Sequence, residues 1–405
     1  MTVSQRGDEF PLEDQTAYGE DSPLEFLCEL QETDPVHWHP AQGEFAPGFW
    51  VVTRYDDVVT VSREARTFRS GDGFLMEKML PGLENLIINQ DPPEHTRNRM
   101  LVARAFTPKV VRSMEGSVRR ATTEIIDRAL EMGEFDFVKD VAAELPLMVI
   151  ADLIGVPRED RHKVFDWSNT MMGRYDPEYG GEEAIAAMEA ADNAAAELFA
   201  YAQTMADDHL ANPRDDLVTK LLTPDENGDM LTAEEYNYFV LLLAVAGNET
   251  TRNLISGGMQ TLFDHPDQRE RVAQDRSLIP SAVEEMLRFV SPVRYFRRTA
   301  AEDTKIGDVP VAQGDHVTIW YGAANRDPRH FEDPHTFDVT REPNEHLAFG
   351  GRGPHYCLGA SLARMEINVM FEEIFERMPD LQPTAPASRL ASSLINGIKH
   401  IPVKV

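Results

Sequence analysis

The sequence is poor in cysteine and in basic residues, and it contains no long apolar run. Only Cys28 and Cys357 occur in 405 residues, which excludes a disulfide framework and suits a reducing compartment. Lys and Arg total 39 against 69 Asp and Glu, a formal net charge of −30 that disfavours binding to nucleic acid or anionic membranes. Because no stretch has the length and apolarity of a signal peptide or membrane anchor, we predict a cytoplasmic protein with no membrane or nucleic-acid partner.

The chain contains instead a succession of apolar patterns with helical period. Shorter apolar alternations, typical of strands, lie between them and in the C-terminal tail. A capping box formed by Thr232 and Glu235 begins the longest predicted helix, which runs to Phe263. We therefore expect a mainly α fold with small β-sheets, with residues 1–20 as a flexible arm and residues 21–405 as a single domain. Helices are predicted over residues 23–32, 55–62, 108–131, 142–155, 157–172, 182–210 and 279–290, and strands over 36–39, 49–53, 293–299, 309–321 and 381–405.

The most informative segment runs from Phe349 to Arg364 and delivers Cys357 to the start of a helix. Glycines at 350, 351 and 353 allow backbone N–H groups to approach a sulfur. A helix N-terminus adds unpaired N–H groups and a positive dipole end, both of which favour a thiolate. An inert buried cysteine and a phosphate loop are the alternatives, but the usual phosphate-binding motifs are absent. The loop indicates a site for an anionic sulfur ligand.

Two pairs of polar residues stand at helical spacing elsewhere in the chain. His95 and Arg99, four residues apart near a helix start, can donate to one anion, although a solvated helix face explains them too. In the apolar centre of the 232–263 helix, Thr250 can bond the carbonyl of Ala246 and loosen the helix locally. Glu249 beside it is costly to bury unless it has a partner or a function.

Together these segments resemble cytochrome P-450, the family of haem-thiolate monooxygenases. The family phrase Phe-x-x-Gly-x-His/Arg-x-Cys-x-Gly is matched by Gly353, His355, Cys357 and Gly359, with Phe349 one residue further from the cysteine than is usual. The resemblance implies the cytochrome P-450 fold and haem b (iron protoporphyrin IX) as cofactor, with Cys357 as the metal ligand. It also implies that one atom of O2 enters a C–H bond of the substrate and the other leaves as water.

The same resemblance implies a role for each polar group. His95, Arg99, Arg298 and His355 would bind the haem propionates, and Glu249 and Thr250 would form the catalytic proton-delivery pair. A structural charge network would hold the cysteine loop in place through Glu285, Arg288 and Arg341. The substrate pocket is predicted to contain Met76, Met171, Val245, Ala246, Val293, Phe296 and Ile395. For Met171, as for Trp167, Met172 and Tyr175 near it, packing in the core is an equally good account.

The resemblance also bears on substrate and partners. The longer cysteine loop is similar to that of members acting on sterols and branched-chain lipids, with a terpenoid as the alternative. No flavin or iron–sulfur segment is visible, so electrons would come from a ferredoxin and a ferredoxin reductase. The ferredoxin would dock on a monomer at Arg104, Lys109, Arg112, Arg352 and Arg364. Two rival readings remain: a peroxide-driven haem enzyme would normally lack Glu249 and Thr250, and a haem sensor or carrier would need no proton path.

Overall fold

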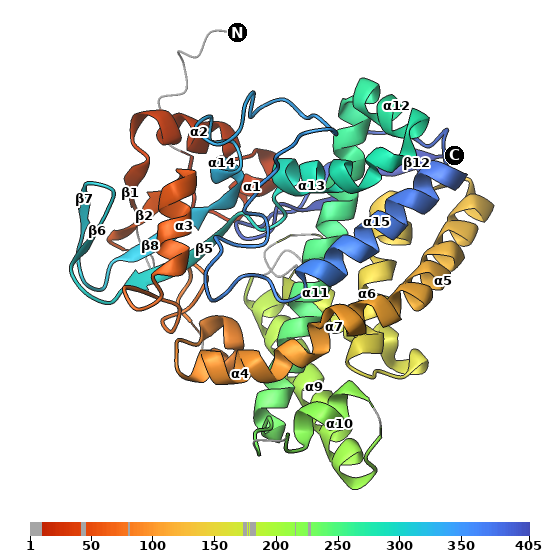
Figure 1. Cartoon of the computed structure of the whole chain (residues 1–405), viewed down its shortest axis with the longest axis horizontal. Helices are drawn as coiled ribbons and strands as arrows, with labels where there is room; N and C mark the ends of the chain where they lie inside the picture. The colour runs from red at the N-terminus through yellow and green to blue at the C-terminus, as the bar shows by residue number, and fades with distance from the viewer. Residues whose placement is uncertain are drawn as a thin grey trace.

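The computed structural model describes residues 10–41, 46–79, 82–172, 176, 178, 184–214, 216–225 and 228–405. Helices form most of the molecule, and the main β-sheet lies toward one side of it (Figure 1). This confirms the predicted fold class. The helices are α1 Ala17–Glu20, α2 Leu24–Thr33, α3 Tyr55–Arg63, α4 Glu94–Val102, α5 Pro108–Met132, α6 Glu144–Leu153, α7 Arg161–Met172, α9 Ala184–Ala211, α10 Leu217–Leu222, α11 Ala233–Asp264, α12 Pro266–Gln274, α13 Ile279–Val290, α14 Tyr321–Ala324 and α15 Ala360–Arg377.

The main sheet has five strands in the order β1-β2-β8-β5-β3. Its neighbours are antiparallel except for β2 and β8, which run parallel. Three smaller sheets pair β10 with β11, β6 with β7, and β12 with both β4 and β9. The strands are β1 Val36–Pro40, β2 Gly48–Val52, β3 Phe68–Arg69, β4 Glu134–Asp136, β5 Tyr295–Ala300, β6 Thr304–Ile306, β7 Val309–Val311, β8 His316–Trp320, β9 Gln382–Pro383, β10 Ser388–Arg389, β11 Ile398–His400 and β12 Pro402–Lys404.

Helix α11 passes through the centre of the molecule between the sheet side and the helices α5, α6 and α9 (Figure 1). The predicted capping box is present, with Thr232 and Glu235 bonded to each other's backbone N–H groups. The helix is continuous through Gly247, so the predicted local loosening does not interrupt it. A Cβ on Gly247 would lie 2.4 Å from Cδ1 of Ile150, so this glycine allows α6 to pack directly against α11.

The N-terminal segment differs from the prediction. Residues 1–9 lie outside the described residues, but residues 10–20 pack against the sheet instead of forming an arm. Leu12 and Tyr18 are fully buried, and the Tyr18 hydroxyl donates to the Leu12 carbonyl at 2.8 Å. The Arg294 guanidinium lies 5.0 Å from the centre of the Tyr18 ring. Burial of this segment ties the start of the chain to β5 and its neighbours.

Several elements are absent from the predictions, among them α10, α12, α14, the short strands β3, β4 and β6, and a π-helix at Val138–Ala142. Among the helices that the structure describes, none combines the length and apolarity needed to span a membrane.

A large apolar core joins α5, α6, α11, α13 and α15, and a second joins the main sheet to α3. The cysteine loop and α15 meet α11 and α13 at the edge of the first core.

Candidate active site

The cysteine loop is held by its own backbone and by close contact with α3. The Cys357 N–H donates to the Phe349 carbonyl at 2.8 Å, and the chain enters α15 after Gly359. A Cβ on Gly353 would lie 1.8 Å from the carbonyl oxygen of Ser62 in α3, and one on Gly351 would lie 2.2 Å from its Oγ. These two glycines therefore serve the approach of α3, which is a different reason from the one predicted. Burial raises the pKa of Cys357, while the Gly359 N–H, Arg99 and Arg364 favour its anionic form.

The structure brings together the four predicted anion-binding residues. The rings of His95 and His355 lie 4.1 Å apart, and the charges of Arg99 and Arg298 act on both. Burial, with Arg99 and Arg298, lowers the pKa of His95 to about 4. Burial, with Arg298, His95 and Arg99, lowers that of His355 to about 2. Asp91 acts on this group but already accepts bonds from two backbone N–H groups. The cluster has donors and positive charge suited to an anionic ligand.

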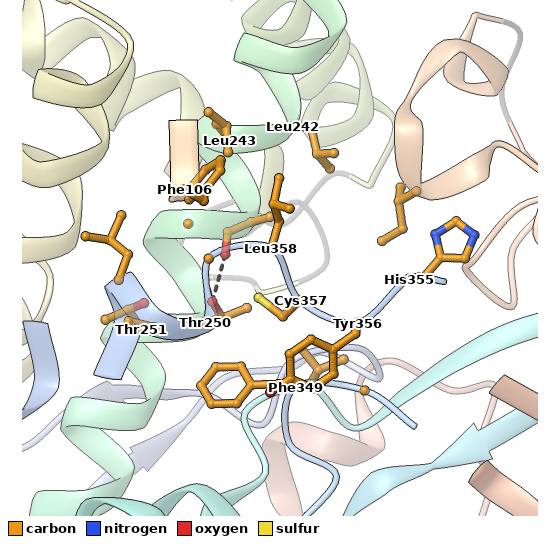
Figure 2. Close-up of a pocket in the computed structure, with 18 of the residues that line it drawn as sticks. Phe106, Leu242, Leu243, Thr250, Thr251, Phe349, His355, Tyr356, Cys357 and Leu358 are labelled. Carbon is orange, nitrogen blue, oxygen red and sulfur yellow. Dashed lines mark hydrogen bonds between the residues drawn. The ribbon is translucent and has the colours of Figure 1, made fainter. Parts of the chain in front are cut away.

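The site opens into a cavity between the cysteine loop, α11, α15 and α4. Cys357 and Thr250 both face this space, one from the loop and one from α11 (Figure 2). The lining is mostly apolar and includes Ile87, Ile88, Val102, Phe106, Ile150, Phe239, Leu242, Leu243, Ala246, Leu254, Leu287, Val293 and Phe296.

Of the residues predicted for the substrate pocket, Ala246, Val293 and Phe296 line the cavity, and the other four do not. Met76 packs in the apolar cluster of the sheet, and Met171 packs against the helical core. Val245 precedes Ala246 by one residue in α11, so its side chain points about 100° away from that of Ala246. Ile395 pairs with Val293 through an isolated β-bridge and is buried behind it.

The neighbours of Met171 are also accounted for where the structure describes them. Trp167 donates to Glu197 at 2.6 Å and packs on Tyr201, so it joins α7 to α9. The side chain of Met172 and the whole of Tyr175 lie outside the described residues. The sequence analysis missed two lining residues on α11, Leu242 and Leu243. They precede Ala246 and Gly247 by four residues, and this helical spacing could have identified them.

The pair on α11 is formed as predicted at Thr250 and differs at Glu249. The Thr250 hydroxyl donates to the Ala246 carbonyl at 2.7 Å. Glu249 is only 1 % exposed and does not line the cavity. Its Oε2 accepts from Arg252, whose other nitrogen donates to Asn169 of α7 at 3.0 Å. Burial raises the pKa of Glu249, although Arg252 opposes the shift.

A carboxyl group that the sequence analysis missed does line the cavity. Glu366 of α15 is 3 % exposed, and its Oε2 has no hydrogen-bond partner among the described residues. Burial raises the pKa of Glu366 well above the ordinary value. The Glu366 carboxyl group therefore faces the same space as Cys357 and Thr250, and burial favours its neutral form.

The predicted charge network on α13 is present. Arg288 donates to both oxygens of Glu285 at 2.7 and 2.8 Å, and both side chains are fully buried. Arg341 donates to Glu285 at 3.2 Å, and Asn344 donates to it at 3.0 Å. The network joins α13 to the chain that leads into the cysteine loop.

A single cysteine at the start of a helix, facing a buried cavity beneath a long central helix, defines a haem-thiolate enzyme. The family model of cytochrome P-450 matches residues 113–379. A steroid C26-monooxygenase of Rhodococcus jostii is 42 % identical over 97 % of this chain and 84 % of its own length. A methyl-branched lipid omega-hydroxylase of Mycobacterium bovis is 41 % identical over 88 % of this chain and 84 % of its own.

Solved structures agree with the sequence relatives. A Mycobacterium marinum cytochrome P-450 in complex with pseudoionone superposes with a TM-score of 0.90 at 35 % identity, and the match covers 100 % of both chains. The chain therefore belongs to the cytochrome P-450 family. It is a monooxygenase, and hence an oxidoreductase, whose cofactor is haem b.

Proposed function

We propose that Cys357 is the thiolate ligand of the haem iron and that the enzyme hydroxylates a sterol or a methyl-branched lipid. The observation that carries the proposal is a single cavity lined by both residues, Cys357 from the loop and Thr250 from α11. When bound, the haem supplies the activation of O2 by which one oxygen atom enters a C–H bond. A thiolate ligand favours cleavage of the O–O bond.

The cluster of His95, Arg99, Arg298 and His355 would hold the two propionates. Arg298 is 3 % exposed, and its Nη1 donates to the Arg297 carbonyl. A buried guanidinium is stabilised by pairing with an anion. Burial and the neighbouring arginines lower the pKa of both imidazoles, and the negative charge of a propionate would oppose that shift.

Proton delivery is assigned to Thr250 at the cavity and to a carboxyl group behind it. Glu249 is held by Arg252 on the far side of α11 from the cavity, so it needs Arg252 to move before it can reach Thr250. Glu366 already faces the cavity, and burial favours its protonated form. Each of the two carboxyl groups can therefore serve a different part of the path, with Glu366 nearest the reacting space.

The substrate class follows from the apolar lining and from the two kinds of relative. A titration of the purified enzyme with cholesterol, a methyl-branched fatty acid and pseudoionone, followed by the shift of the haem Soret band, tests it. The sterol and the branched acid should shift the band at lower concentrations than pseudoionone does. A response to pseudoionone alone would replace the proposal with a terpenoid substrate.

Turnover with the ligand that shifts the band then tests the reaction. NADH with a ferredoxin and its reductase should give a product with one added oxygen. Product from hydrogen peroxide alone would indicate a peroxide-driven enzyme. If no ligand of the panel supports NADH consumption, only a haem carrier would remain.

The electron donor is proposed to be an acidic ferredoxin that docks beside the cysteine loop. Three of the five predicted docking residues already have acidic partners: Arg104 pairs with Asp225, Arg352 with Glu345, and Arg364 with Glu284. Lys109 and Arg112, both exposed in the first turns of α5, therefore carry the proposal. Charge reversal at both should weaken the apparent affinity for ferredoxin at low salt. Reversal of Arg269, which lies in α12, should not.

A further inference from the structure

Arg364, on the second turn of α15, is held by contacts that a docking residue would not need. Its Nε donates to Oε1 of Glu284 at 2.6 Å, and its Nη2 donates to Oε2 at 2.8 Å. The two side chains are 32 % and 30 % exposed. A two-pronged pair of this kind fixes the plane of the guanidinium as well as its position.

The same guanidinium lies over the ring of Phe349. Its Cζ is 4.4 Å from the ring centre, which is within the range of a cation–π contact. The carbonyl of Phe349 accepts the N–H of Cys357 at 2.8 Å, and Figure 2 shows the Phe349 ring beside the cysteine. Arg364 therefore contacts the ring of the residue whose carbonyl binds the Cys357 N–H.

Glu284 is fixed from its other side by His346. Nε2 of His346 lies 3.1 Å from Oε2 of Glu284, and the Ala348 N–H lies 3.2 Å from Nδ1 of the same ring. Since Nδ1 accepts from a backbone N–H, Nε2 carries a proton and donates it to Glu284. His346 thus orients the carboxylate that holds Arg364.

We propose that Arg364 is a positioning residue that, in balance with Glu284, sets the electron density on the Cys357 sulfur and thereby the reduction potential of the iron. The inference rests on the proposed function, since it requires Cys357 to be the ligand. Reduction adds negative charge to the iron and its ligand. A cation beside the sulfur stabilises the reduced state and raises the potential, and a carboxylate behind the cation offsets part of that effect.

The test is a spectroelectrochemical titration of the substrate-free holoenzyme. Arg364→Gln should shift the potential to more negative values, because Glu284 is left without its partner. Glu284→Gln should shift it to more positive values, because the charge of Arg364 is no longer offset. Arg364→Lys keeps the charge and should stay near the wild type. Arg352→Gln removes a cation from the same loop, but its pair with Glu345 is exposed and should give a smaller shift than Arg364→Gln.

The opposite signs separate a charge effect from a merely structural one. If both neutral variants shift the potential in the same direction, or if neither shifts it, the proposal is overturned. Should Arg364→Gln fail to retain haem, Glu284→Gln decides alone, and only a positive shift supports the proposal. If the wild type lacks the red-shifted Soret band of a thiolate-ligated ferrous carbonyl, the proposed function itself fails. That spectrum is independent of the potentials of the variants, so the two failures can be distinguished.

Discussion

The buried pair of Glu285 and Arg288 yields a quantitative prediction for Arg288→Ala. Arg288 makes two bonds to the carboxylate and donates to the carbonyls of Asn325, Pro334 and Thr336 at 2.8 to 3.0 Å. Removing one partner of such a pair leaves a charge without compensation and costs about 3–5 kcal/mol. Each lost carbonyl bond adds roughly 0.5–1.5 kcal/mol where water does not replace it. Since domain stability is about 5–15 kcal/mol, the variant should be barely folded.

Urea unfolding of freshly purified holoenzyme measures this loss, with Arg119→Ala as the matched control. Arg119 also bridges two carboxylates, those of Glu115 and Glu372, but its side chain is 45 % exposed. An exposed pair of this kind contributes about 0–1 kcal/mol. Arg288→Lys should fall between the two, because lysine keeps the charge but cannot form the two-pronged contact. Equal losses for Arg288→Ala and Arg119→Ala would refute the reasoning.

Two further predictions concern turnover and pH. Thr250→Ala should lower product formation by on the order of 10²-fold, whereas Thr250→Ser, which keeps the hydroxyl, should stay near the wild type; unchanged product yield from Thr250→Ala would remove the residue from the proton path. Burial opposes the charged form of His400, but hydrogen bonds to Asp136 and Glu178 outweigh it and raise the pKa. This stabilisation is present below the unfolded value of about 6.5 and is lost as pH rises through the raised pKa. The melting temperature of His400→Gln should therefore lie below that of the wild type at acid pH and approach it at alkaline pH, and a difference that is constant with pH would contradict the assignment.

Regular periodicity and capping chemistry predicted the elements that carry the site. Helix α13 begins and ends at the predicted residues, and α11 begins after the predicted capping box. Hydrogen bonds within a helix depend on residues close in the chain, so local sequence is sufficient for them. The packed segment 10–20, in contrast, depends on distant partners. Tyr18, for example, is buried against Arg294, and no local pattern shows that contact.

The site was predictable where a motif fixes a role and unpredictable where orientation decides it. The placement of Cys357 and Thr250 on the cavity, and the grouping of the residues predicted to bind propionates, follow from spacing and resemblance. An apolar residue such as Val245 cannot be assigned to the cavity from composition, because one step along a helix turns the side chain toward a neighbour instead. The ion pair of Arg364 with Glu284 joins residues 80 positions apart, so the sequence predicted a docking role for Arg364 and gave no sign of its partner.

The central claim is the bond between iron and the sulfur of Cys357, and the absorption spectrum of the reduced enzyme under carbon monoxide tests it most directly. We predict the red-shifted Soret band of thiolate ligation for the wild type and its loss, together with loss of hydroxylation, for Cys357→Ser. A wild-type spectrum without that band, or a serine variant that retains the band and the product, would contradict the account.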